Sequence, residues 1–462
     1  MTALNVDFKE PENLETYIIK DGLKVVEHFF DLPLDWSNPG GSKKIKVFAR
    51  QCIPTDKART PEDQAKLPIV LYLQGGPGFE VPLVKQGGFG GELYKAGYQV
   101  LWLDQRGTGL STPLSADTLP SDVKTAQEIA NYTKFFRADS IVKDCEAIRR
   151  TLLGSRENEA DRKWTTLGQS YGGFLTLTYL SFHPEGLKES WLTGGLAPVA
   201  LKEPGLVYQK LMPGLVKRNE IYYRKYPQDV ARVRKIVSYL ETNKVITPNG
   251  STLSLARFQL LGMDLGRQGG IDDVHQIVFR AAHELATLGK LSYKMIQTIE
   301  QANSTDGNPI YAILQEPAYT QGAAARWAGK RAIQSHPQFS WDHVKSLSED
   351  QPLYFIGEMM IPEIFDDFAA LRPFKEAVEI LAEDDSWAPL YDLDQLAKNE
   401  VKATAVTYTE DLFVDFELAQ DTARRVKGLE QYITNQLYHD GLRANPVDVL
   451  GKLWELSRRE YD

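Results

Sequence analysis

The segment GQSYG at residues 168–172 has the pattern G-x-S-x-G, whose serine can act as a nucleophile. It follows a strand-like stretch, residues 163–168, and opens a helical one, residues 171–182. In that setting the serine stands at a sharp strand-to-helix turn, and the two flanking glycines remove Cβ atoms that would clash there. We therefore predict that Ser170 is the nucleophile of an acyl-transfer site, with a helix N-terminus behind it that favours negative charge.

A serine nucleophile needs a base, and His439 is the best-placed candidate. The chain has seven histidines, at positions 28, 183, 275, 283, 336, 343 and 439. With this motif the order along the chain is serine, acid, histidine, and only His439 follows the strand-like segment that begins near residue 402. It lies in a glycine-containing loop after the short strand-like QYITN. We expect His183 at a helix end and the four histidines of residues 198–396 on helix surfaces or satisfied in the core.

The acid that orients this histidine should follow the strand-like segment at residues 402–411. Three carboxylates lie there, Glu410, Asp411 and Asp415. Asp411 falls at the mouth of the strand, whereas Asp415 begins the next helical segment, where a carboxylate satisfies free N–H groups. We predict Asp411, with Glu410 and Asp415 as the alternatives. In some proteins with this motif the acid instead follows the strand after the nucleophile helix, but that stretch here, TGGLAPVALK, has no carboxylate.

The glycine-rich QGGPG at residues 74–78 follows an apolar strand-like run and offers backbone N–H groups. Acyl transfer needs two such donors aimed at the oxygen that becomes negative. We predict that one is the N–H of Tyr171, the residue after the nucleophile, and that the other is the N–H of Gly76. A plain tight turn is the alternative for this segment, because GGPG favours a turn in any context.

Strand-like and helical segments alternate through the first part of the chain. The strand-like runs are residues 23–36, 44–53, 67–74, 98–107, 163–168 and 189–195, and the helical patterns are 139–153 and 171–182. Long helical patterns then dominate until the strand signal returns at 402–411. This order is typical of a mostly parallel sheet with helices on both faces. With the serine motif it predicts an α/β-hydrolase fold, whose core is residues 1–197 and 397–462 and whose large helical cap, 198–396, is inserted over the carboxyl edge of the sheet.

Composition narrows the possible partners. The 462 residues are 42% hydrophobic and 25% charged, with a net charge of -9 that disfavours nucleic acid, and no apolar run is long enough to span a membrane. The polar N-terminus does not read as a secretory signal, so we expect a cytoplasmic protein. Cys52 and Cys145 are expected to be ordinary buried or half-buried thiols, and the absence of a CxxC or His/Cys cluster predicts no metal.

With these residues identified, the chain resembles the proline iminopeptidases, in the larger form with an extended helical cap. The matching segments follow the family's order through most of the chain: LQGGPGFE (73–80), WLDQRGTGLSTP (102–113), GQSYGGF (168–174), EPAYTQGAAARWAGKR (316–331), LYFIGEM (353–359), TEDLFVDFELA (409–419) and TNQLYHDGLR (434–443). Many relatives carry histidine where this chain has Gln74, which helps to shape the glycine-rich loop. The resemblance also implies that residues 104–107 form a structural turn without a catalytic step.

The resemblance implies a serine peptidase that releases an N-terminal residue, usually proline, from a peptide with a free N-terminus, without a cofactor. The free ammonium group is best recognised by carboxylates in a pocket that holds little water. The resemblance points to glutamates of the cap, Glu358 first and Glu316 second. The alternative for each is an ordinary solvated carboxylate on the surface. Gly75 and Phe79 are expected against the substrate.

Three other functions are compatible with the same residues. An esterase or amidase acting on small non-peptide substrates would use the same serine, histidine and acid, because these do not select the leaving group. An aminopeptidase that releases a di- or tripeptide is a close variant of the reading above. A hydrolase fold used only for binding is disfavoured by the complete set of Ser170, Asp411 and His439.

Overall fold

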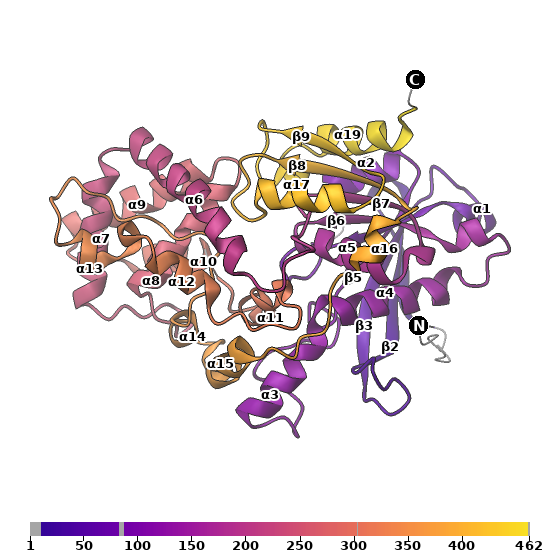
Figure 1. Cartoon of the computed structure of the whole chain (residues 1–462), viewed down its shortest axis with the longest axis horizontal. Coiled ribbons are helices and arrows are strands. Elements are labelled where there is room, and N and C mark those ends of the chain that lie inside the picture. The colour runs from indigo at the N-terminus through magenta and orange to yellow at the C-terminus, as the bar shows by residue number, and fades with distance from the viewer. Residues whose placement is uncertain (1–10, 83–86, 303, 461–462) are drawn as a thin grey trace.

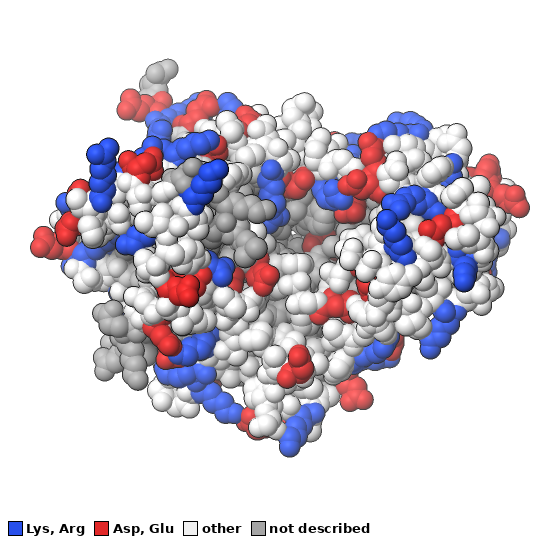
Figure 2. All heavy atoms as spheres, turned by 180° about the vertical axis from the view of Figure 1, so that it is seen from behind, with Lys and Arg blue, Asp and Glu red and all other residues white. Residues whose placement is uncertain are grey.

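The computed structural model describes residues 11–82, 87–302 and 304–460. Two lobes lie side by side in Figure 1: a sheet flanked by helices, which we call the sheet lobe, and a group of helices beside it. Seen from behind, the surface is hollowed where the lobes meet, and basic and acidic side chains are interspersed over both (Figure 2).

The described residues form one nine-stranded sheet with the strand order β1-β2-β3-β5-β4-β6-β7-β8-β9. The pairs that join β1, β2, β3 and β5 are antiparallel, and all the later pairs are parallel. The strands are β1 Glu12–Ile19, β2 Leu23–Pro33, β3 Lys44–Pro54, β4 Ile69–Leu73, β5 Gln99–Asp104, β6 Trp164–Gln169, β7 Leu187–Thr193, β8 Lys402–Tyr408 and β9 Leu429–Thr434. This mostly parallel sheet confirms the predicted fold class.

Helices cover both faces of the sheet, because its central strands are apolar on both sides. Every residue of β4, β5 and β6 is buried. Successive residues of a strand face opposite ways, so Leu71 enters the hydrophobic core with α4 (Ala138–Leu153) and α5 (Tyr171–Phe182). Its neighbour Tyr72 enters the second core, with α2 (Gly88–Lys95) and α19 (Pro446–Arg458).

The chain between β7 and β8 is helical within the described residues, apart from one isolated bridge. We use "cap" for its helices α6 to α15: α6 Gly205–Lys225, α7 Asp229–Thr242, α8 Leu255–Gln259, α9 Gly270–Thr287, α10 Tyr293–Ala302, α11 Pro309–Leu314, α12 Ala328–Gln334, α13 Trp341–Val344, α14 Ile364–Asp367 and α15 Lys375–Glu383. The next helix, α16 (Leu393–Ala397), contacts α5 and α17 (Phe416–Arg425) of the sheet lobe. The division into residues 1–197, 198–396 and 397–462 stays a prediction. Helix α16, which falls almost wholly within the expected cap, packs against the sheet lobe, and α15 contacts α3 (Ala126–Thr133) of that lobe.

Sequence patterns missed several short elements of the sheet lobe, among them β1, α1, α2 and α3. Strand β1 is exposed along nearly its whole length, so it carries no hydrophobic alternation, and only its backbone pairing with β2 defines it. The helices α1 (Pro61–Lys66), α2 and α3 (Ala126–Thr133) are each eight residues or fewer. Elements this short give too few turns for a periodicity to be recognised.

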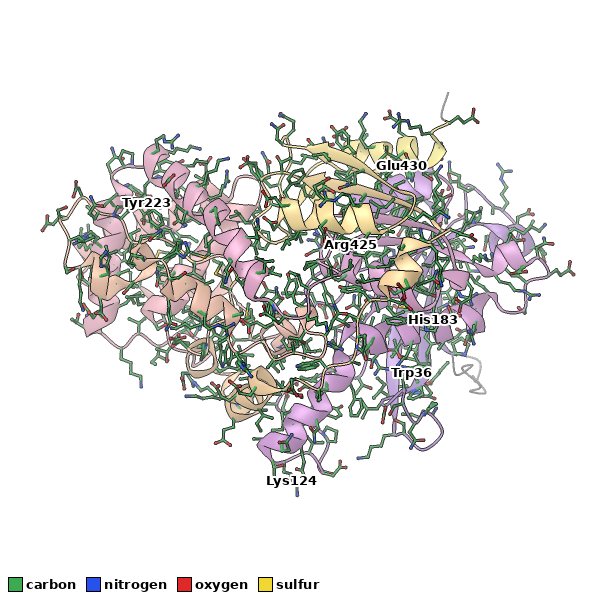
Figure 3. All side chains as sticks on the ribbon, viewed as in Figure 1. Trp36, Lys124, His183, Tyr223, Arg425 and Glu430 are labelled. Atoms are coloured by element: carbon green, nitrogen blue, oxygen red, sulfur yellow. The ribbon has the colours of Figure 1, made fainter. Side chains whose placement is uncertain are left out.

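Two smaller expectations are confirmed. Helix α5 ends at Phe182 and His183 is its C-cap residue, in the sheet lobe (Figure 3). Both cysteines, Cys52 and Cys145, are buried free thiols.

A buried ion pair ties the end of β5 to helix α4. The guanidinium of Arg106 donates two hydrogen bonds to the carboxylate of Asp144, at 2.6 and 2.5 Å, and also donates to the backbone carbonyls of Pro33, Leu34 and Phe135. Both side chains are almost wholly inaccessible to water. The guanidinium of Arg106 is buried and donates all of these hydrogen bonds within the fold, so the segment at residues 104–107 has a structural role.

We expect the substitution Asp144→Ala to lower the free energy of unfolding by about 3–5 kcal/mol, because it leaves the charge of Arg106 buried without its counter-ion. Denaturant titration followed by circular dichroism measures the change. Asp122→Ala is the control, since its ion pair with Lys43 is exposed, and it should leave the denaturation midpoint in place. A midpoint for Asp144→Ala equal to that of the control would contradict the role given to the buried pair.

Candidate active site

Ser170 lies at the junction of β6 and α5 with backbone angles φ 56° and ψ -123°. A side-chain-bearing residue rarely adopts this conformation, and it persists only where the surroundings enforce it. The surroundings do so by close backbone contact. A Cβ atom at Gly172 would lie 1.8 Å from the carbonyl oxygen of Leu73, and one at Gly168 would lie 2.3 Å from the carbonyl oxygen of Gly172. The two motif glycines are therefore a steric requirement of the turn that presents the serine.

The structure brings together the three side chains that the sequence singled out. His439 Nε2 lies 2.8 Å from Ser170 Oγ, and His439 Nδ1 lies 2.8 Å from Asp411 Oδ2. The second carboxylate oxygen, Asp411 Oδ1, accepts hydrogen bonds from the backbone N–H groups of Phe413 and Val414, at 2.8 and 3.1 Å. The aspartate is thus held as a hydrogen-bond acceptor, which orients the imidazole with Nε2 toward the serine.

The two alternative acids have other partners. Glu410 accepts hydrogen bonds from Lys217 of the cap helix α6. Asp415 is the N-cap of α17 and accepts from the backbone N–H of Leu418 at 2.9 Å, which is the helix-start role expected for it. Asp411 is therefore the carboxylate that faces the histidine.

Gly194, just after β7, was not singled out by sequence reasoning. It has φ +52°, and a Cβ atom there would lie 3.2 Å from His439 Nδ1 and 3.4 Å from Asp411 Oδ2. The next residue is equally constrained, because a Cβ atom at Gly195 would lie 2.6 Å from the carbonyl oxygen of Ser170. The only sequence signal was the pair of glycines in TGGLA. Such a pair indicates that another part of the molecule comes close to the backbone there, but it does not identify that part.

The surroundings of His439 raise its pKa above the usual range of an imidazole. Burial lowers the pKa, but the charge and hydrogen bond of Asp411 and the charge of Glu358 together outweigh it. The ring of Phe413 also packs on the imidazole, with 4.5 Å between the ring centres. The site therefore stabilises the imidazolium that forms when the histidine takes the proton of the serine.

The glycine-rich loop after β4 touches the nucleophile. A Cβ atom at Gly75 would lie 3.0 Å from the Cβ atom of Ser170. Gly76 has φ +134°, a conformation that residues with side chains rarely adopt. Helix α5 begins at Tyr171, so the N–H of that residue belongs to the first turn, whose donors have no partner within the helix. Both predicted oxyanion donors thus lie on segments that border Ser170.

Gln74 is held by partners on two different elements. Its Oε1 accepts hydrogen bonds from Tyr72 Oη at 2.9 Å and from Arg443 Nη2 at 3.3 Å, and its backbone carbonyl accepts from Gln105 Nε2 at 3.0 Å. Arg443 belongs to α18 (Gly441–Ala444), which follows the loop of His439. The glutamine therefore links the glycine-rich loop to the segment that carries the histidine.

Cap helix α11 packs directly on the same loop. A Cβ atom at Gly78 would lie 2.6 Å from the Cβ atom of Ile310, and Asn308 Nδ2 donates to the carbonyl of Gly78 at 3.0 Å. The ring of Phe79 meets the edge of Tyr311, with centres 5.1 Å apart. The Phe79 ring is thus partly used in packing against the cap.

The two glutamates suggested for amine recognition occupy different environments. Glu358 is half-buried and accepts a hydrogen bond from Tyr311 Oη at 2.5 Å, and burial raises its pKa to about 7 against the lowering effect of that bond. Glu316 is 5% exposed and accepts from the backbone N–H of Gly329 at 2.8 Å, and burial raises its pKa to about 7 as well. A Cβ atom at Gly329 would lie 3.3 Å from the Cβ atom of Met359, the neighbour of Glu358, so the two carboxylates border one region.

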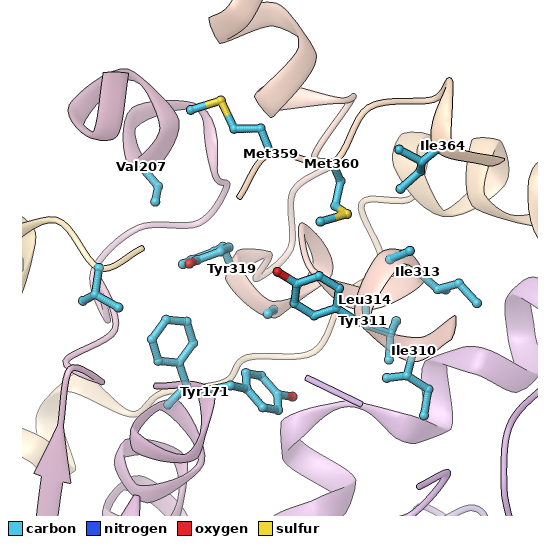
Figure 4. Close-up of a cluster of buried hydrophobic side chains, with 14 of the residues drawn as sticks. Tyr171, Val207, Ile310, Tyr311, Ile313, Leu314, Tyr319, Met359, Met360 and Ile364 are labelled. Carbon is cyan, nitrogen blue, oxygen red and sulfur yellow. The ribbon is translucent and has the colours of Figure 1, made fainter. Parts of the chain in front are cut away.

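Aromatic and apolar side chains surround that region. Figure 4 shows Tyr171 from the nucleophile helix below Tyr319 and Tyr311 of the cap, with Met359 and Met360 beyond them. Phe174 of α5 meets Tyr319 edge to face, with ring centres 5.4 Å apart. We call these aromatic and apolar side chains between the lobes the apolar seam.

Neither a metal cluster nor a membrane helix is found in residues 11–82, 87–302 and 304–460. No group of three or more His, Cys, Asp and Glu side chains could hold a metal ion there. No helix in that part of the chain is long and apolar enough to cross a membrane.

Comparison with known proteins places this geometry in a family. The alpha/beta hydrolase fold family matches residues 68–242. Proline iminopeptidase aneH of Aspergillus aculeatus is 37% identical over 436 residues, which cover 94% of this chain and 93% of that protein. The proline iminopeptidase of Aeromonas sobria is 36% identical over 445 residues, which cover 96% of this chain and 98% of that protein. The chain therefore belongs to the proline iminopeptidase family of α/β hydrolases.

Proposed function

We propose that the protein is a serine aminopeptidase that releases an N-terminal residue, preferentially proline, from peptides through an acyl-enzyme. The observation that carries this proposal is the continuous path of hydrogen bonds from Ser170 through His439 to Asp411, with 2.8 Å at each step. A serine, an imidazole and a carboxylate in this order form a nucleophile, a general base and an orienting acid.

In the first stage His439 Nε2 takes the proton of Ser170 Oγ while that oxygen attacks the carbonyl carbon of the first residue. The carbonyl oxygen becomes negative, and the N–H groups of Tyr171 and Gly76 stabilise it. The imidazolium then gives its proton to the departing amine, so the peptide bond breaks and the shortened peptide leaves. The first residue remains as an ester on Ser170.

In the second stage water replaces the amine. His439 takes a proton from the water as its oxygen attacks the ester, then returns that proton to Ser170 Oγ, and the free amino acid leaves. The carboxylate of Asp411 stabilises the imidazolium of His439 in both stages.

Recognition of the free N-terminus is assigned to the cap. Glu358 is the first candidate for the ammonium group, because its charge reaches His439 and the carboxylate therefore lies near the reacting atoms. Glu316 is the second candidate, bordering the same apolar seam. An ammonium group would favour the ionised form of either carboxylate, whose pKa burial has raised to about 7.

The setting proposed for this reaction is the cytoplasm. Cys52 and Cys145 are free buried thiols, which is typical of a reducing compartment. Peptides are the proposed partners, whereas the net charge of -9 disfavours nucleic acid.

We expect Ser170→Ala, His439→Ala and Asp411→Asn each to lower kcat on proline naphthylamide by a factor on the order of 10⁴ or more. The first two remove the nucleophile and the base, and the third holds the imidazole in the wrong tautomer. Steady-state kinetics of the purified variants measures the loss. Asp415→Asn is the matched control, because this side chain caps the start of α17 and asparagine caps a helix as well as aspartate does. Comparable losses in Asp411→Asn and Asp415→Asn would remove Asp411 from the mechanism.

The pH dependence should follow His439. The base must be neutral, so kcat/KM for the wild-type protein is expected to rise with pH through an apparent pKa above the usual value for histidine. In Asp411→Asn the raising charge is absent, so the residual activity should rise through a lower pKa. A profile measured with a small ester, which has no ammonium group, removes the titration of the substrate, and Glu358→Gln in both backgrounds removes that of the neighbouring carboxylate. An unchanged midpoint in the Asp411→Asn variant would contradict the assignment.

Glu358→Gln should act selectively on substrates with a free N-terminus. Loss of a charge-assisted hydrogen bond is worth about 1.5–3 kcal/mol, so kcat/KM on proline naphthylamide should fall roughly 10- to 150-fold. Because the charge of Glu358 also raises the pKa of His439, the comparison is made at a pH where the imidazole is neutral in both proteins. There N-blocked proline naphthylamide and nitrophenyl acetate should be turned over as by the wild type. Glu316→Gln tests the second candidate in the same assay, and Glu349→Gln, on the cap surface, is the control. Equal losses on free and blocked substrates would exclude amine recognition by Glu358.

A further inference from the structure

We propose that Arg218, on cap helix α6, is a positioning residue for the catalytic base: it holds Tyr438, the chain neighbour of His439. The proposal rests on the proposed function of His439. Strand β9 ends at Thr434 and α18 begins at Gly441, so His439 stands on a loop without regular secondary structure. A base on such a loop must be held by side-chain contacts, because a displacement of 1 Å can cost about 10²-fold in rate.

Arg218 joins that loop to the cap. Its side chain is 6% exposed. Its Nε donates to the carbonyl of Leu265 in the cap at 2.9 Å, and its Nη1 donates to Tyr438 Oη at 3.2 Å. The guanidinium carbon also lies 4.6 Å from the centre of the Tyr438 ring. One planar group therefore fixes both the hydroxyl and the ring of the residue next to the base.

The cap contacts the other side of the base as well. The backbone N–H of Gln268 donates to Asp440 Oδ1 at 3.0 Å, so His439 lies between two residues that the cap holds. A Cβ atom at Gly266 would lie 2.3 Å from the ring of Phe413, which in turn packs on the imidazole. The cap segment at residues 265–268 is thus in contact with the surroundings of the base, and Arg218 ties that segment to Tyr438.

Arg218 is far more buried than Lys210 and Lys217, the other basic residues of α6 that bond to the sheet lobe. The charged link between Lys217 and Glu410 is 56% and 33% exposed and is weakened by water. The planar guanidinium presents several donors in a rigid fork, whereas the single ammonium of a lysine is a point charge on a flexible stem. A lysine at position 218 cannot reproduce the contact with Leu265 and the stacking on Tyr438 together.

Loosening the loop of His439 and removing the charge of Arg218 would shift the pKa of His439 in opposite directions. The groups that act on the pKa of His439 are Asp411 and Glu358, which raise it, and Arg443, which lowers it. If Arg218 positions the base, its removal weakens the hydrogen bond between His439 and Asp411, and the apparent pKa falls. If Arg218 acted only as a nearby positive charge, its removal would raise that pKa. The direction of the shift therefore separates the two explanations.

The test compares Arg218→Ala, Arg218→Lys, Tyr438→Phe and Tyr438→Ala. For Arg218→Ala we expect kcat on proline naphthylamide to fall about 10- to 100-fold with KM within about twofold, by the cost of displacing a reacting group. The rate of Ser170 labelling by a fluorophosphonate should fall in parallel, and the pKa in the kcat/KM profile should decrease. Tyr438→Ala should show the same losses in kcat and labelling rate and the same fall in pKa. The double variant Arg218→Ala/Tyr438→Ala should be no less active than either single variant. Arg218→Lys should be little more active than Arg218→Ala.

Tyr438→Phe keeps the ring and loses only the hydroxyl, so it should retain most of the activity. The matched control is Lys210→Ala, on the same helix, whose ion pair at 2.5 Å also joins the cap to the sheet lobe but ends on Glu417 of α17. It should keep the kcat and pH profile of the wild type. Tyr438 is only half-buried, so its variants carry the test if Arg218→Ala does not fold.

Two results separate the failure of this inference from that of the proposed function. If His439→Ala is inactive while Arg218→Ala and Tyr438→Ala keep the kcat and pH profile of the wild type, the positioning role is wrong and the mechanism stands. If His439→Ala itself retains wild-type activity, the proposed function is wrong and the inference fails with it. A loss in Lys210→Ala equal to that in Arg218→Ala would also overturn the proposal, because any cap contact would then suffice.

Discussion

The path of hydrogen bonds between Ser170, His439 and Asp411 sets the constraint that the rest of the structure meets. Each step is 2.8 Å long, so three loops must be placed to within a few tenths of an ångström of one another. Parallel strands make this possible, because β6, β8 and β9 run in the same direction and their carboxyl ends lie at one edge of the sheet. The serine follows β6, the aspartate follows β8 and the histidine follows β9.

Close backbone approach is the condition under which these loops can meet. A Cβ atom at Gly172 would collide with the carbonyl oxygen of Leu73 at the end of β4. One at Gly194 would lie 3.2 Å from the imidazole, and one at Gly75 would lie 3.0 Å from the Cβ atom of Ser170, so neither position has room to spare. The same closeness removes water. Burial alone would lower the pKa of His439, and the charge of Asp411 is what allows the buried imidazole to accept a proton.

In the proposed function, the sheet lobe carries out the chemistry and the cap recognises the substrate. The sheet lobe holds the nucleophile, the base and the acid, while the cap places Glu358 and an apolar seam over them and contacts the loop of the base through Arg218. Helix α11 adds a further link, since Ile310 packs on the glycine-rich loop and Tyr311 donates a hydrogen bond to Glu358. Recognition and chemistry are therefore connected by packed side chains and not by the sheet alone.

The sequence by itself determined the nucleophile turn, the alternation of buried strands and helices, and the order of serine, acid and histidine, because each is written in neighbouring residues or in their periodicity. The choice of Asp411 over Glu410 and Asp415 rested on where the strand was expected to end. In the structure Asp411 contacts His439, whereas Glu410 binds Lys217 and Asp415 caps a helix through Leu418. Only the tertiary structure decided what Gly194 and Arg218 touch, which is the imidazole in one case and Tyr438 in the other. These partners lie more than 200 residues away in the chain, and no local pattern records a contact that forms only when two lobes pack together.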